Sequence, residues 1–171
     1  MRWRRAGLLI GIWYSLSDPL VAQVRGFAAA TAGAAFDLDQ SIPGSGSGFA
    51  FVTSAGVWVR RIQLGVEYGQ HTRGSSRKAT EYGMLLRLPA VATGGLRPYL
   101  AGGLAEYRFD PAQGGTTNAF GGSLGPGVWV RLGRTRVALL VEARFHTTFE
   151  QLASIAGRDF ATVSTGLQVD W

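Results

Sequence analysis

Apolar and polar residues alternate along most of the chain, and the pattern is clear in the last ten residues, TVSTGLQVDW. Val163, Leu167, Val169 and Trp171 occupy alternate positions, and the residues between them are polar or small. Because successive side chains of a strand point to opposite faces, the pattern predicts a strand with one apolar face and one polar face. An ordinary edge strand that happens to end in tryptophan would give the same local pattern, so this segment alone does not identify the kind of sheet.

Similar segments recur along the chain and give eight predicted strands. We place them at 24–36, 47–60, 62–72, 80–91, 97–109, 119–132, 136–149 and 159–171. Their connections alternate between long polar stretches (DLDQSIPGSG, TRGSSRKA, DPAQGGTTN, EQLASIAGR) and short ones (RR, ATGG, GRT). All long connections should therefore lie at one end of the sheet, which is typical of barrels that cross an outer membrane. Each segment is also long enough to cross a bilayer, which takes about 9–11 residues per strand.

The two faces of each predicted strand differ in size and polarity. Ile62, Leu64 and Val66 share one face, whereas Glu67 and His71 share the other. An eight-stranded barrel has an interior just wide enough for side chains to fill, and rows of bulky residues would crowd it. We therefore expect an all-β, eight-stranded antiparallel transmembrane up-and-down barrel with its apolar faces toward lipid. The alternative is a water-soluble, lipocalin-like barrel with the faces reversed.

An internal repeat supports a barrel built from hairpins. GVWVR occurs at 56–60 and again at 127–131. The segments that follow, LGVEYGQH and LLVEARFH, share the pattern Leu-x-Val-Glu-x-x-x-His. Self-similarity of this kind indicates one structural unit that is copied along the chain.

Charged residues recur on the face expected to point inward. Charges buried in a barrel wall cost too much free energy unless they are paired, so we expect a network of ion pairs that fills the lumen. The expected members are Arg60, Glu67, Glu81, Arg87, Glu106, Arg131, Glu142 and Arg144. The alternative is a charged lining of an open pore.

The N-terminal residues have the layout of a secretory signal peptide. A basic MRWRR precedes the apolar run AGLLIGIWYSL, and the sequence SDPLVA ends it. We assign 1–22 as the signal peptide and 23–171 as the barrel domain, with a buried N-terminal helix as the alternative. The net charge of +6 includes no long basic run, so we expect no nucleic-acid partner. The absence of Cys excludes disulfides and Cys-based metal sites.

The leader, the eight strands, RPYLAGGLAEYRF at 97–109 and the terminal LQVDW together resemble the small outer-membrane β-barrels of the OmpA/OmpX type. The resemblance implies export to the cell outer membrane, contact with its lipid and lipopolysaccharide, and insertion by the barrel-assembly machinery, which would read Trp171 as its signal. It leaves the function open, because this fold hosts adhesins, structural anchors, narrow channels and enzymes. We expect Trp171 at the periplasmic interface, with Tyr99 facing outward at the same level.

Candidate catalytic and metal-binding residues are few. Small barrels that deacylate lipid A use a His-x-Ser motif with a carboxylate partner. Here Thr148, two positions after His146, holds the place of the Ser, with Glu142 on the same face. The chain has only two histidines, His71 and His146, and a metal site would need a third ligand. We therefore interpret both as members of a polar lumen network and expect no enzyme activity, cofactor or metal.

A small basic group, Arg73, Arg77 and Lys78, lies at the predicted outer rim. These side chains suit the phosphates of lipopolysaccharide, or else they are the solvated tip of a hairpin. Taken together, the sequence predicts a monomeric small outer-membrane barrel with a structural or surface-interaction role. A narrow channel and a lipid A-modifying enzyme are the alternatives.

Overall fold

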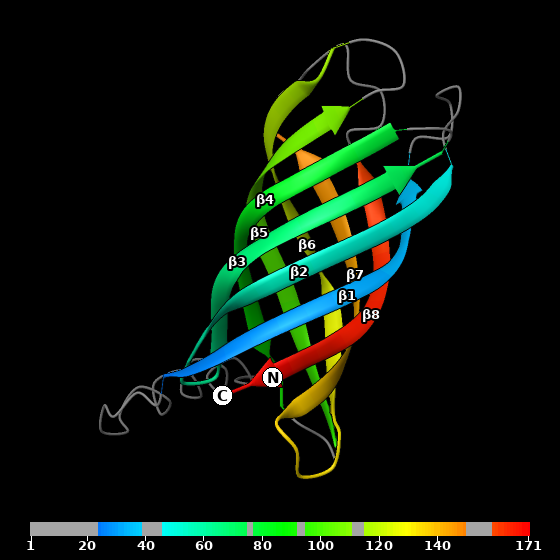
Figure 1. Ribbon diagram of the computed structural model, residues 1–171. Helices are drawn as coiled ribbons and strands as arrows, with labels where there is room; N and C mark the ends of the chain where they lie inside the picture. Colours follow the sequence, from blue (N-terminus) through cyan, green and yellow to red (C-terminus); the bar gives the residue numbers. More distant parts are fainter. Residues whose placement is uncertain (1–23, 39–45, 75–76, 92–94, 111–114, 150–158) are drawn as a thin grey trace, which may run out of the picture.

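The computed structural model describes residues 24–38, 46–74, 77–91, 95–110, 115–149 and 159–171, which form a closed antiparallel barrel (Figure 1). The strands are β1 (Arg25–Asp37), β2 (Ser47–Val59), β3 (Ile62–Arg73), β4 (Arg77–Pro89), β5 (Leu96–Asp110), β6 (Thr117–Arg131), β7 (Val137–Thr148) and β8 (Phe160–Asp170). Each strand pairs with the next along the chain, and β8 returns to pair with β1. The predicted fold class is therefore confirmed.

Closure at β1 and β8 leaves the sheet without an edge. Eleven residue pairs join the two strands, from Phe27 opposite Asp170 to Asp37 opposite Phe160. Beyond them, the backbone groups of Gly26 and Trp171 exchange two hydrogen bonds, of 2.9 and 3.0 Å. Hydrocarbon offers no partner to a free backbone N–H or C=O, so closure satisfies the main requirement for a sheet that crosses a bilayer.

The short connections lie at the end where β1 begins and β8 ends, the lower end in Figure 1. They are residues 60–61, 90–95 and 132–136. One expectation at the opposite end was wrong, because TRGSSRKA is not a long loop. β3 runs on to Arg73 and β4 starts at Arg77, so only 74–76 connect them. Where a strand extends beyond the bilayer, both of its faces can be polar. The sequence of such a segment then resembles the sequence of a loop.

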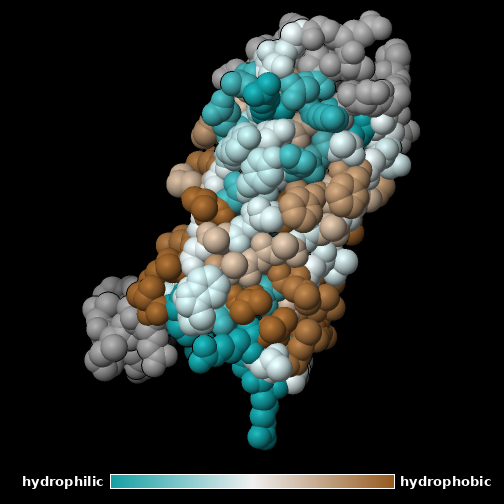
Figure 2. Space-filling view, in the orientation of Figure 1, coloured by the Kyte–Doolittle hydropathy of each residue, from teal (hydrophilic) through white to brown (hydrophobic). Residues whose placement is uncertain are grey.

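The outer surface carries the apolar faces, as the alternation predicts. Ile62, Leu64 and Val66 on β3 are exposed, and so is Val141 on β7. Figure 2 shows brown side chains around the waist of the visible face, with teal ones above and below them. Among the described residues, no helix is long and apolar enough to span a membrane. The proposed signal peptide, 1–22, lies outside the described residues.

Several glycines lie where a neighbouring strand comes too close for a side chain. A Cβ atom added at Gly125 of β6 would lie 1.9 Å from the carbonyl oxygen of Ala143 on β7. Pro126, which follows it, faces outward and has no N–H to donate to the ladder. The two residues therefore mark a point where β6 and β7 approach closely without regular pairing.

The contact at Gly125 gives a first prediction. Gly125→Ala should lower the free energy of unfolding by about 1–3 kcal/mol, because the methyl group has to displace backbone atoms. Gly95→Ala is the matched control, since a Cβ atom there would meet nothing within 4 Å. Urea unfolding in lipid vesicles, followed by Trp fluorescence, measures both variants. Equal midpoints for the two variants would contradict this account of β6.

Candidate functional site

The lumen is filled in three levels, which follow one another along the barrel axis. The level nearest the short turns, here called the aromatic layer, is mostly aromatic and aliphatic. Its members are Phe27, Ala29, Trp58, Leu85, Tyr99, Ala101, Trp129 and Leu140, all buried. The rings of Tyr99 and Trp129 lie 3.9 Å apart between centroids, and those of Trp58 and Trp129 lie 5.4 Å apart. Bulky residues therefore do occur inside, where they alternate with alanine and glycine.

At the mouth of the barrel, polar side chains accept hydrogen bonds from the indole N–H groups of the aromatic layer. The indole N–H of Trp58 donates to Asp170 at 3.1 Å, and that of Trp129 donates to Gln168 at 3.2 Å. Gln168 in turn donates to Asp170 at 2.7 Å. These groups line a pocket of about 150 Å³ together with Arg97 and Arg131. The two copies of the GVWVR repeat thus place their tryptophans side by side.

The middle level, here called the charged layer, is built around Arg144. Its guanidinium donates to both carboxylate oxygens of Glu67, at 2.7 and 2.9 Å, and also to Glu142. Arg87 donates to Glu142 at 3.0 Å, and the hydroxyl of Tyr99 donates to the same carboxylate at 2.8 Å. All these charged groups are at most 5% exposed. Arg144 on β7 thus joins β3 across the lumen, where the two charges compensate each other away from water.

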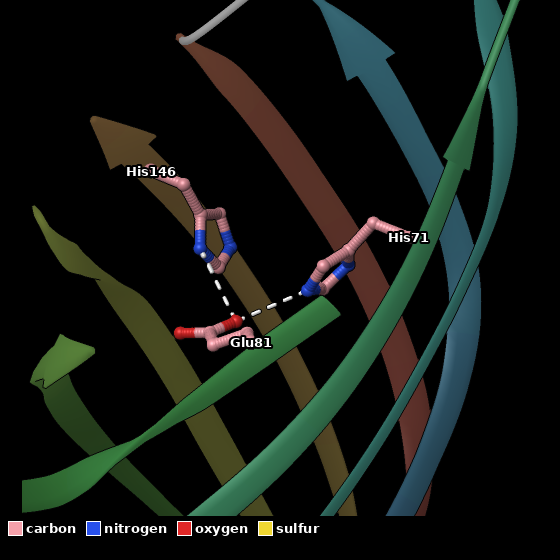
Figure 3. A group of neighbouring side chains, drawn as sticks. All are labelled: His71, Glu81 and His146. Carbon is pink, nitrogen blue, oxygen red and sulfur yellow. Dashed lines mark hydrogen bonds and ion pairs between the residues drawn. The ribbon is translucent and has the colours of Figure 1, made fainter. Parts of the chain in front are cut away.

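The upper level, here called the histidine cluster, contains His71, Glu81, Tyr107 and His146. Figure 3 shows Nε2 of His71 and Nδ1 of His146 converging on one oxygen of Glu81, at 3.0 and 3.6 Å. The hydroxyl of Tyr107 lies 3.2 Å both from the other oxygen of Glu81 and from Nδ1 of His146. The ring of Phe160 stacks on that of His146, with centroids 4.4 Å apart.

A further ion pair lies in the lumen beyond the histidine cluster. Arg73 donates to Asp37 at 2.8 Å, and both side chains are buried. The guanidinium of Arg73 also lies over the ring of Phe160, 4.4 Å from its centroid, and 5.8 Å from that of Phe109. The outer end of β3 is thereby fixed to β1 through side chains in the lumen.

Five of the eight residues expected in the lumen lie there: Glu67, Glu81, Arg87, Glu142 and Arg144. Three expectations were wrong, because Arg60, Arg131 and Glu106 are exposed. Arg60 and Arg131 have the inward parity of their strands. Arg60, however, lies in the turn after β2 with φ at 58°, and Arg131 lies at the open mouth.

Glu106 was assigned to the wrong face of β5. Tyr107 and Phe109 point inward on this strand, which turns Glu106 outward at the level of Tyr82 and Phe120 on the adjacent strands. Tyr99 has the same inward parity as Tyr107. The expectation that Tyr99 faces lipid beside Trp171 was therefore also wrong, because Tyr99 is 3% exposed.

The basic group at the outer rim does not form as expected. Arg73 is inside the lumen, on the same face of β3 as His71, and is 1% exposed. Lys78 is exposed, whereas the side chain of Arg77 lies outside the described part of the chain. Arg73 lies two positions after His71, so the inward parity continues past the end of the predicted strand.

The residues compared with a lipid A-modifying site have other partners. Nε2 of His146 lies 3.1 Å from the hydroxyl of Thr162, and Nδ1 faces Glu81 and Tyr107. Glu142 is held by Arg87, Arg144 and Tyr99 in the charged layer. Thr148 is buried at the outer end of β7.

Comparison with known proteins extends the description of the fold. Neisserial surface protein A (NspA) matches with a TM-score of 0.64 and 20% identity, over 85% of this chain and 95% of that one. The N-terminal β-barrel domain of Pseudomonas aeruginosa OprF matches with a TM-score of 0.59 and 13% identity, over 85% and 97%. No family model and no curated protein sequence matches the chain. The chain therefore has the fold of small outer-membrane barrels, as the resemblance in its sequence implied.

The charged layer gives a second prediction. Glu142→Ala should lower the free energy of unfolding by about 3–5 kcal/mol, because Arg87 loses its carboxylate partner and Arg144 loses one of two. Glu106→Ala, which removes the same group from the exposed face, should change it by no more than about 0.5 kcal/mol. Urea unfolding in lipid vesicles measures the difference. Similar values for the two variants would show that the charged layer does not stabilise the barrel.

Proposed function

We propose that this protein is an outer-membrane barrel with a closed lumen, which acts as a structural element of the envelope or presents its outer loops to surface partners. The observation that carries the proposal is the contact of Arg144 with Glu67 and Glu142 inside the barrel. These groups occupy the centre of an interior that is just wide enough for side chains. A lumen filled in this way favours a scaffold over a channel.

The proposed location rests on two observations. The fold is that of outer-membrane barrels, and the leader at 1–22 has the layout of an export signal. One protein of similar fold is named a surface protein, which agrees with a role at the cell surface. The proposed role is not catalytic, and we propose a monomer because closure leaves no strand edge open to a second copy.

We propose membrane lipid and lipopolysaccharide as the surroundings of the barrel. Exposed apolar residues of the outer face suit acyl chains, and exposed cations such as Lys78 and Arg108 suit phosphate groups near the outer rim. Arg108 also lies 3.6 Å from Asp110, so its charge is partly compensated. With Arg73 inside the lumen, the basic surface is smaller than the sequence indicated.

Conductance across a planar bilayer tests the closed lumen. The refolded protein should give no steady current, and an open porin in the same lipid serves as the positive control. Trp129→Ala should remain silent too, because the charged layer and the histidine cluster still close the lumen beyond the aromatic layer. A steady, voltage-independent current through the wild-type barrel would exclude the closed scaffold and favour the narrow channel.

Trp171 gives a further prediction, on assembly. Its indole lies across Gly26, where an added Cβ atom would come within 2.3 Å of the ring, and its side chain is 59% exposed. Deleting Trp171 should sharply reduce the barrel in the outer membrane of cells, since we propose that the barrel-assembly machinery reads this residue. Refolding into detergent should suffer much less, because the eleven residue pairs between β1 and β8 remain. Normal insertion of the truncated protein in cells would rule out the signal role.

A further inference from the structure

The histidine cluster contains a buried acid that forms no direct ion pair with an Arg or Lys of the described residues. Each other buried carboxylate of the described residues faces a guanidinium: Asp37 faces Arg73, Glu67 faces Arg144, and Glu142 faces Arg87 and Arg144. Glu81, at 1% exposure, forms ion pairs only with the two imidazoles. A buried carboxylate requires a compensating positive charge, and a neutral imidazole does not supply one.

The positions of the donor atoms fit a small divalent cation. One ligand atom from each of His71, Glu81 and His146 lies within 4.8 Å of the other two. Zn²⁺ takes nitrogen and oxygen ligands at about 2.0–2.2 Å, so neighbouring ligand atoms of a tetrahedral site lie about 3.3 Å apart. The distances from Glu81 to the two imidazole nitrogens, 3.0 and 3.6 Å, bracket that value.

One tautomer of His146 points a lone pair toward the same point. Its Nε2 faces the hydroxyl of Thr162 at 3.1 Å, a contact that suits an N–H on Nε2 and a lone pair on Nδ1. The hydroxyl of Tyr107 lies 3.2 Å from both Nδ1 and a Glu81 oxygen, but it has only one proton to donate. One of these two acceptors therefore stays without a donor from Tyr107, and a cation would satisfy it.

Gly69 keeps space at this point, because a Cβ atom there would come within 2.8 Å of Nε2 of His71 and 3.2 Å of Glu81. Nε2 is also the ring nitrogen of His71 that faces Glu81.

We propose that His71, Glu81 and His146 bind one Zn²⁺ ion, or a transition-metal ion of similar size, inside the barrel. His71 contributes Nε2, His146 contributes Nδ1, and Glu81 contributes a carboxylate oxygen. Tyr107 supports Glu81 from the other side or supplies the fourth ligand. Two imidazoles favour Zn²⁺, Cu²⁺ or Ni²⁺ over Ca²⁺ and Mg²⁺, which prefer oxygen ligands alone.

The ion would connect opposite walls of the barrel. His71 lies on β3 and Glu81 on the adjacent β4, whereas His146 lies on β7, four strands from β3 in the closed order. A bound ion therefore links β7 to β3 and β4, with which β7 is not paired in the sheet, and its binding stabilises the closed barrel by mass action. The proposed role is structural, and it adds a ligand that the scaffold function does not require.

The test uses full-length barrel without an affinity tag, because His71 and His146 are then the only histidines and Cys is absent. The protein is refolded with and without ZnCl₂, dialysed, and its metal content measured by mass spectrometry. Wild type should retain one Zn²⁺ per barrel and unfold at a higher temperature with the metal. Co²⁺ in its place should give the visible absorption of a tetrahedral site, and excess Ca²⁺ or Mg²⁺ should not compete.

Two variants test whether the ion binds in the histidine cluster. Glu81→Gln removes the anionic ligand and should abolish the retained zinc, whereas the matched Glu106→Gln changes an exposed acid and should keep it. Thr162→Val removes only the hydroxyl that orients His146 and should weaken zinc binding about 10–100-fold. If Glu81→Gln fails to fold, as judged by heat-dependent gel mobility, Thr162→Val and the Co²⁺ spectrum decide. A wild-type barrel that retains no zinc, or equal retention by wild type and Glu81→Gln, would overturn the proposal.

Discussion

The narrow interior of an eight-stranded barrel is the constraint on which the rest of this structure depends. Every side chain that points inward has to share one narrow space with those from seven other strands. The sizes and charges of the inward side chains therefore have to match at each level of the lumen. Large rings alternate with Ala and Gly, and Arg144 sits between Glu67 and Glu142. The outer face has no such requirement, and its bulky residues need only be apolar.

The two copies of the sequence repeat lie on opposite sides of the barrel. They place Glu67 and His71 on β3, and Glu142 and His146 on β7. These strands lie four apart in the closed order, so equivalent residues face each other across the lumen. The two glutamates both bind Arg144, and the two histidines both contact Glu81. The barrel interior thus has an approximate twofold pattern, which single residues such as Arg144 and Glu81 complete.

Most of the fold could be predicted from the sequence because alternation records which face meets lipid. The predicted strand ends are wrong where a strand extends beyond the lipid and both of its faces are polar. Arg73 looked like part of a polar loop because β3 has two polar faces above the apolar band, and Glu106 was assigned inward for its charge although Tyr107 and Phe109 fill that face. His71 and His146 were correctly placed in a polar lumen network, but their convergence on Glu81 was missed, because alternation gives the face of a residue and not its level along the barrel axis. The shared Glu-x-x-x-His spacing was the signal that could have placed both histidines at one level.

The contacts of Arg144 also bear on how the chain reaches its final state. Arg144 and Glu67 are 77 positions apart in the chain, and neither can meet the other within a hairpin of neighbouring strands. Arg144 can pair early with Glu142 on its own strand, but the charge of Glu67 stays uncompensated until β7 and β3 face each other across a nearly complete cylinder. A partly assembled sheet would therefore expose unpaired charge to hydrocarbon, which is unfavourable. Insertion and lumen formation should accordingly occur as one cooperative event, with few stable species between a hydrated chain and the finished barrel.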